Sequence, residues 1–206
     1  KTFELDQGSE DIDAHFFDVD GDGDQDLYVV SGGNEFKETD TLLQDRLYLN
    51  NGKGNFEKSN NQLPEMISSG SCVKSADYDN DGDLDLFIGG RLIPNQYPYA
   101  PNSYLLENDG KGYFTDVTSQ KAAQLEAVGM VTDAIWTDFN SDGLPDLILV
   151  GEWMPITLFE NKNGKLINSS EDKGLNDSEG WWNSIATADF DQDGDLDFIA
   201  GNFGLN

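Results

Sequence analysis

The sequence predicts an all-β fold built from repeated units of four antiparallel strands. An acidic segment of nine residues recurs four times, beginning at residues 18, 77, 138 and 189, so that successive copies are 59, 61 and 51 residues apart. Each copy is followed by a short apolar run that ends at or near a glycine, which is typical of a buried strand. After the first three runs, two further short strands flank an Asn-Gly or Asp-Gly turn, which is a strong hairpin signal.

The acidic segment from Asp77 to Asp85 contains five carboxylates in nine residues. Charges at this spacing repel one another, and a hard divalent cation removes the repulsion. Oxygens at positions 1, 3, 5 and 9 can converge on one ion, position 7 can offer its backbone carbonyl, and Gly82 at position 6 permits the sharp bend. Calcium fits best, because no loop contains His or Cys and because magnesium prefers to keep several waters.

The sequence therefore predicts about four calcium ions. The expected ligands occupy the odd positions of the four loops: Asp18, Asp20, Asp22, Asp24, Asp26, Asp77, Asp79, Asp81, Asp83, Asp85, Asp138, Asn140, Asp142, Leu144, Asp146, Asp189, Asp191, Asp193, Asp195 and Asp197. The third loop differs from the others, because Asn140 replaces an aspartate and Pro145 precedes the final ligand. We expect this third site to be the weaker one.

These loops are not EF-hands, although the first positions look similar. An EF-hand loop needs a glutamate at position 12 and a helix on each side. Position 12 is apolar in all four loops, where it is Val29, Ile88, Leu149 and Ala200. Because an apolar strand follows each loop, we expect the loop to join two strands.

The four strands per repeat match one blade of a β-propeller. The repeat units span residues 10–60, 68–119, 129–170 and 180–206, which gives about three and a half blades in a single partial domain covering residues 1–206. Each calcium loop then joins strands 1 and 2 of its blade, and residues 1–5 are predicted to be the last strand of a preceding blade. More chain, or self-association of two copies, would complete the ring. A cadherin-like or solenoid array is the alternative fold. Six phenylalanines are expected in the core: Phe16, Phe17, Phe56, Phe87, Phe114 and Phe159.

Composition excludes some partners. The formal net charge of −28 argues against nucleic acid and against unaided docking on anionic lipid. No apolar run is long enough to insert directly into a membrane. Cys72 is the only cysteine, so no internal disulfide forms. Weak calcium sites fill at millimolar extracellular calcium, so we expect an extracellular, cell-surface or periplasmic location.

The pattern Asp-x-Asp-x-Asp-Gly-x-x-Asp-Leu, followed by an apolar strand and an Asn-Gly-x-Gly-x-Phe hairpin, resembles the FG-GAP/VCBS repeats. Those repeats build the calcium-binding β-propeller of integrin α chains and of many bacterial surface proteins. Segments 108–118, 151–155 and 180–184 are most similar to bacterial VCBS-repeat proteins of the ASPIC/UnbV type. The resemblance implies an extracellular, calcium-stabilised propeller used for adhesion or for carbohydrate-related tasks, without naming one ligand.

Similarity to integrin propellers also implies that a ligand face lies opposite the calcium loops. The connections expected there are residues 31–45, 90–102, 151–155 and 171–183. Aromatic rings beside Arg and Glu can stack on sugars or hold a peptide, although the tryptophans can equally pack between blades. The candidate ligand-binding residues are Arg91, Glu152, Trp153, Trp181 and Trp182.

The sequence favours a non-enzymatic module for adhesion, or for binding a carbohydrate or protein ligand at a cell surface. A carbohydrate-active enzyme with its chemistry opposite the calcium loops is the alternative, with Glu152 as the best free carboxylate. Catalysis has less support, because His15 is the only histidine and lies on a predicted strand beside Phe16. Cys72 is expected to be a buried apolar residue.

Overall fold

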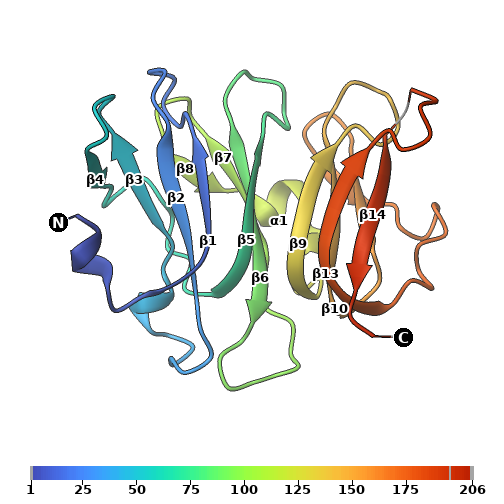
Figure 1. The fold of residues 1–206 in the computed structure, drawn as a ribbon, viewed down its shortest axis with the longest axis horizontal. Helices are drawn as coiled ribbons and strands as arrows, with labels where there is room; N and C mark the ends of the chain where they lie inside the picture. Colours follow the sequence, from blue (N-terminus) through green and yellow to red (C-terminus); the bar gives the residue numbers. More distant parts are fainter. Residues whose placement is uncertain (1, 195, 205–206) are drawn as a thin grey trace.

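The computed structural model describes residues 2–194 and 196–204. Within them, three antiparallel sheets stand side by side, and within each four-stranded unit the strands that follow one another in the chain pair (Figure 1). The first sheet contains β1 (Glu10–Phe17), β2 (Asp26–Gly32), β3 (Arg46–Asn50) and β4 (Phe56–Lys58). The second sheet contains β5 (Ser69–Ala76), β6 (Asp85–Leu92), β7 (Tyr104–Asn108) and β8 (Phe114–Asp116). The predicted all-β class and its four-stranded antiparallel units are confirmed.

The third sheet repeats this arrangement and continues into a final hairpin. Its four strands are β9 (Met130–Thr137), β10 (Asp146–Met154), β11 (Thr157–Asn161) and β12 (Leu166–Asn168). The hairpin consists of β13 (Gly180–Ala188) and β14 (Asp197–Asn202). It joins the sheet where Glu152 of β10 lies opposite Trp181 of β13. The first strands β1, β5, β9 and β13 lie beside one another through the middle of the molecule (Figure 1).

The second strand of each complete sheet is buried on both faces. Along β6, Leu86 and Ile88 pack into the apolar cluster shared with the first sheet, whereas Phe87 packs into the cluster shared with the third sheet. Along β10, Leu147 faces the second sheet and Ile148 faces β13. Alternate side chains of a strand point to opposite faces, so a continuous apolar run fills two cores at once.

Four short helical elements complete the described chain: η1 (Phe3–Asp6), η2 (Thr41–Leu43), α1 (Thr118–Lys121) and η3 (Ala123–Leu125). The prediction that residues 1–5 form a strand is wrong for the described part. The Phe3 ring packs on Tyr48, with centroids 4.9 Å apart, and Asp6 accepts a hydrogen bond of 2.8 Å from the Tyr48 hydroxyl. Side chains therefore hold this segment against β3 as a single 3-10 turn. No described helix has the length and apolarity needed to cross a bilayer.

The predicted burial of Phe16 is also wrong. Phe17 is buried, with 3% of its surface exposed, whereas Phe16 is 54% exposed. The two residues are neighbours on one strand, so their side chains point to opposite faces. Only the face of β1 that carries Phe17 packs against the second sheet.

Candidate functional site

The four acidic loops join β1 to β2, β5 to β6, β9 to β10 and β13 to β14, as predicted. All four connections lie at the same end of the molecule, at the top of Figure 1. In each loop the carboxylate at position 1 accepts a hydrogen bond from the backbone N–H of the glycine at position 6. The distances are 3.0 Å for Gly23 to Asp18, 3.1 Å for Gly82 to Asp77, 2.9 Å for Gly143 to Asp138 and 3.2 Å for Gly194 to Asp189.

The second loop shows best why a cation fits. Oxygens of Asp77, Asp79 and Asp85 lie within 4.8 Å of one another. Asp79 Oδ1 and Asp85 Oδ2 are buried and accept no hydrogen bond from the described residues. Burial, and then the nearby charges of Asp79 and Asp81, raises the pKa of Asp85 to about 7. Buried carboxylate oxygens without a donor are costly, and calcium takes ligands of this type.

The other loops repeat the arrangement with differences. Three-carboxylate groups of the same compactness form at Asp18, Asp20 and Asp22, and at Asp189, Asp191 and Asp197. In the third loop, Asn140 Oδ1 and Asp138 Oδ1 both accept from the backbone N–H of Asp142, at 2.9 and 3.0 Å. The predicted ligand Asp195 lies outside the described residues.

The position-7 carboxylates of the first two loops, Asp24 and Asp83, do not belong to the three-carboxylate groups of their loops. The Asp24 carboxylate lies so close to Gly52 that a Cβ added to this glycine would be 2.6 Å from it. In the same way, a Cβ added to Gly110 would be 2.5 Å from the Asp83 carboxylate. These two carboxylates therefore lie against the hairpin turns of their own repeats. This leaves the backbone carbonyl as the group that position 7 can offer, as the sequence predicts.

An asparagine ends each third strand, and in the second and third repeats its side chain connects neighbouring repeats. In the sequence this asparagine looks only like part of a turn. The backbone N–H groups of Asn50, Asn108 and Asn161 donate to the position-9 aspartate of their own loop, at 2.7, 2.9 and 2.7 Å. The Asn108 side-chain amide also donates to the Val19 carbonyl of the preceding acidic loop, at 2.8 Å. The Asn161 amide reaches the Tyr78 carbonyl in the same way, at 2.6 Å. The recurring Asn before the Asn-Gly or Asp-Gly turn is the sequence signal that could have revealed this link.

The opposite end of the molecule brings together Arg91, Glu152 and Trp181. Glu152 Oε1 accepts hydrogen bonds from the Arg91 guanidinium at 2.5 Å and from the Trp181 indole N–H at 2.8 Å. Glu152 is only 6% exposed. The three residues come from β6, β10 and β13, so three successive repeats build this cluster.

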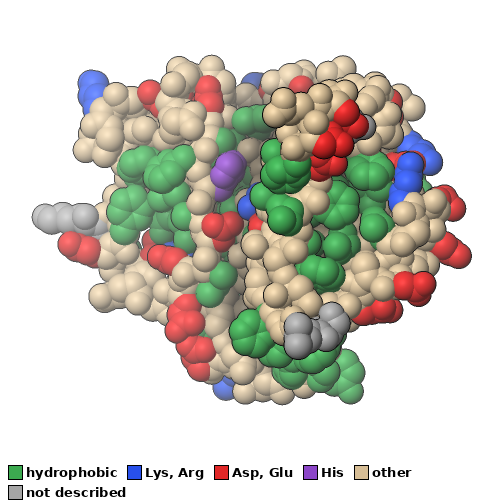
Figure 2. Space-filling model, turned by 45° about the vertical axis from the view of Figure 1, so that its right-hand side comes forward, with side chains coloured by type: hydrophobic (Ala, Val, Ile, Leu, Met, Phe, Trp, Pro, Cys, Tyr) green, Lys and Arg blue, Asp and Glu red, His purple; other side chains and the backbone are tan. Residues whose placement is uncertain are grey.

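Trp153 and Trp182 have different surroundings. Trp153 is 56% exposed, its ring lies 5.4 Å from that of Trp181, and its indole N–H donates to the Tyr97 hydroxyl at 2.6 Å. Trp182 packs against the apolar cluster between β10 and β13, and its N–H donates to the Ser178 carbonyl at 2.9 Å. Of the five predicted ligand-binding residues, Trp182 therefore lies with the core and the other four form one cluster. Figure 2 shows hydrophobic side chains gathered at this lower end of the molecule.

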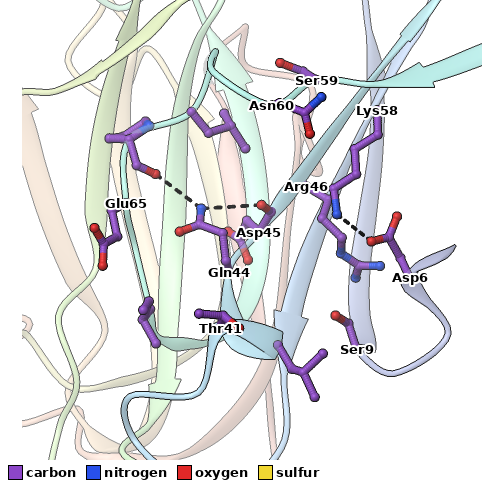
Figure 3. A pocket seen from close by; sticks show the side chains of 14 residues that line it. Asp6, Ser9, Thr41, Gln44, Asp45, Arg46, Lys58, Ser59, Asn60 and Glu65 are labelled. Carbon is purple, nitrogen blue, oxygen red and sulfur yellow. Dashed lines mark hydrogen bonds and ion pairs between the residues drawn. The ribbon is translucent and has the colours of Figure 1, made fainter.

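A separate cavity of about 540 Å³ lies beside β3 and β4 (Figure 3). Arg46 and Lys58 line it, and Lys58 forms an ion pair with Asp6. Its wall includes Asp45, whose carboxylate accepts from the Tyr28 hydroxyl at 2.8 Å. Burial raises the pKa of Asp45 to about 7. The sequence pattern does not mark this carboxyl, because its burial results from tertiary packing.

The repeated acidic loops, each between two strands of a four-stranded unit, define a repeat protein whose loops are suited to bind a hard cation. The sequence pattern of the FG-GAP-like repeat matches residues 6–88 and 138–200, and the chain belongs to this family. The predicted family is confirmed.

The relatives that match by sequence are distant, with identities of 23–26%. Cartilage acidic protein 1 of Xenopus tropicalis is 26% identical over 207 residues, which cover 90% of this chain and 30% of that protein. The human protein of the same name is 23% identical over 208 residues, covering 90% of this chain and 29% of its own length. The chain thus spans less than a third of the length of these relatives.

Two solved structures are similar at a low level. The Vibrio cholerae biofilm matrix protein Bap1 aligns with a TM-score of 0.43 and 18% identity, covering 91% of this chain and 23% of its own. An Agrocybe aegerita lectin, described as recognising non-reducing terminal N-acetylglucosamine, aligns with a TM-score of 0.47 and 20% identity. That alignment covers 81% of this chain and 39% of the lectin. Both are distant likenesses of the fold.

Proposed function

We propose that this chain is part of an extracellular, calcium-binding β-propeller that serves as a module for adhesion or ligand binding. The observation that carries the proposal is the second loop, where oxygens of Asp77, Asp79 and Asp85 lie within 4.8 Å of one another and Asp79 Oδ1 is buried with no hydrogen-bond donor among the described residues. Calcium, when bound, supplies the positive charge that these carboxylates lack. The role proposed for it is structural, because each loop fixes the turn between two central strands.

A propeller accounts for the arrangement of the repeats. Each four-stranded unit packs face to face on the next, and the first strands β1, β5, β9 and β13 lie side by side. Ile199 on β14 is 61% exposed and Phe190 in the preceding loop is 58% exposed. A further strand pair, from more chain or from a second copy, would cover such side chains.

An extracellular location is supported by the fit to calcium sites of moderate affinity, which stay filled only where calcium is abundant. It is also supported by the name of the curated relatives, which places them in cartilage. The ligand, a carbohydrate or a protein, is proposed to bind at the end opposite the acidic loops.

The test is the calcium dependence of stability. Purified protein is melted in 2 mM calcium and in excess EGTA, and calcium binding is measured by isothermal titration calorimetry. At calcium concentrations about a hundredfold above Kd, each site adds about 2.7 kcal/mol to the free energy of unfolding, so we expect a clear rise in Tm. The variant Asp85→Asn should lose one binding event, whereas the matched variant Asp109→Asn, in an exposed turn, should lose none. Equal melting in calcium and in EGTA would show that the structural-calcium proposal is wrong.

A further inference from the structure

The cluster opposite the acidic loops has the construction of a ligand site rather than of packing alone. Trp153 has φ of +56°, a left-handed conformation that bulky side chains rarely adopt. The other described non-glycine residues with positive φ are Asn, Ala, Ser and Gln. This conformation leaves Trp153 56% exposed, held by the Tyr97 hydroxyl at 2.6 Å and lying against Trp181. The backbone strain is thus accompanied by an exposed ring in a fixed position.

Glu152 fixes the polar half of the cluster. Its buried carboxylate holds both the Arg91 guanidinium and the Trp181 indole. A guanidinium carries five N–H donors, and Arg91 keeps 28% of its side chain exposed. The site therefore offers directed hydrogen-bond donors beside an aromatic surface, and both are oriented before a ligand arrives.

The charge of the cluster selects among ligands. Arg91 and Glu152 neutralise one another, and the chain as a whole carries a formal charge of −28. An anionic ligand would approach against this field without a free cation to receive it. The cluster is therefore suited to an electroneutral ligand.

The neighbouring hollow points to a ligand rich in hydroxyl groups. It has a volume of about 380 Å³ and adjoins Arg91. Its wall includes the hydroxyl groups of Ser69, Ser71 and Thr132 and the amide of Asn183. Ile12 and Leu92 add apolar surface beside these polar groups. A sugar carries hydroxyl groups around a C–H face, so small polar groups next to apolar carbon suit it.

We propose that Trp153, Trp181, Arg91 and Glu152 bind a neutral oligosaccharide. One pyranose ring lies with its C–H face on the exposed Trp153 indole, and its hydroxyl groups accept from the exposed N–H groups of Arg91. Glu152 and Trp181 hold these two side chains in place. The adjoining sugar residue occupies the hollow beside Arg91. This inference rests on the proposed ligand-binding function and specifies the ligand class.

The test uses the calcium-loaded chain on an array of neutral, sialylated and sulfated glycans, followed by calorimetric titration with the neutral glycan that gives the strongest signal. Trp153→Gly removes the ring, and glycine adopts the same positive φ freely, so Tm should be kept. Arg91→Gln removes the charged donor. The matched control is Tyr113→Ala, which removes an aromatic residue that is 53% exposed in the β7–β8 turn, at the acidic-loop end.

We expect binding to neutral glycans that falls at least about tenfold in Trp153→Gly, as for a central aromatic contact, and that also weakens in Arg91→Gln. Tyr113→Ala should bind like the unmodified chain. The proposal is overturned if no neutral glycan binds, if only acidic glycans or peptides bind, or if Trp153→Gly binds unchanged. In each of these cases a calcium-dependent rise in Tm would leave the calcium-stabilised module intact, so the two proposals fail separately.

Discussion

The side chain of Asn108 is expected to stabilise the contact between the first two repeats. Its amide donates to Val19 O at 2.8 Å and to Leu84 O at 3.3 Å. Its Oδ1 accepts from the N–H groups of Gly110 and Gly112, at 3.2 and 3.1 Å. Each such bond contributes about 1 kcal/mol net. Allowing for relaxation, Asn108→Ala should lower the free energy of unfolding by about 2–4 kcal/mol.

Asn50 provides a matched control at the same position of the first repeat. Among the described residues, its amide donates only to Gln25 O, at 3.1 Å, and its Oδ1 is buried without a partner. Asn50→Ala should therefore cost about 1 kcal/mol or less. Both substitutions keep the backbone N–H that donates to the position-9 aspartate, so this aspartate keeps its donor in both variants.

The assay is urea denaturation in 2 mM calcium, followed by tryptophan fluorescence, with the m-value checked for each variant. A difference of about 2 kcal/mol between the two alanine variants would measure the additional bonds of Asn108, of which the bond to Val19 O spans the repeats. Asn108→Asp keeps the acceptor but removes the donor, so it should be at least as destabilising as alanine. The reasoning is refuted if Asn108→Ala and Asn50→Ala cost the same within about 0.5 kcal/mol, which is the usual limit for surface changes.

Two further predictions concern single carboxyl groups. Burial raises the pKa of Asp45 to about 7, above its unfolded value of about 3.9. The folded state therefore binds this proton more tightly, and the resulting stability is present below pH 4 and is lost as the pH rises through 7. In Asp45→Asn this pH-dependent part of the free energy of unfolding, at most about 1.4 kcal/mol per pH unit, should be absent, so the urea midpoint should change less between pH 5 and 8 than in the unmodified protein. Parallel plots of urea midpoint against pH for the two proteins would contradict the prediction. Asn140→Asp gives the third loop the missing carboxylate, so calorimetry should detect calcium binding that is severalfold tighter at one site, and unchanged titrations would count against that site.

Local sequence determined the repeat pattern, the acidic loops and the four-stranded units. Carboxylates at alternating positions around a glycine form a turn whose geometry depends on about nine adjacent residues, so spacing alone predicts it. The apolar runs after each loop likewise predicted strands buried on both faces, such as β6 and β10. Where the prediction was wrong, as for Phe16 and for residues 1–5, local pattern could not tell which face of β1 meets a neighbour or whether a partner strand exists.

Only the tertiary structure decided how distant residues are grouped. Asn108 meets the Val19 carbonyl across 89 positions of the chain, and Arg91 meets Glu152 across 61. The tertiary structure also gives the adjacent residues Trp181 and Trp182 different surroundings. Trp181 donates a hydrogen bond to Glu152, whereas Trp182 packs against the core. Alternation along a strand sends neighbouring side chains to opposite faces, but the packing of one sheet on the next decides what each face meets. The acidic loops were therefore readable from the sequence, whereas the aromatic cluster became visible only in the folded chain.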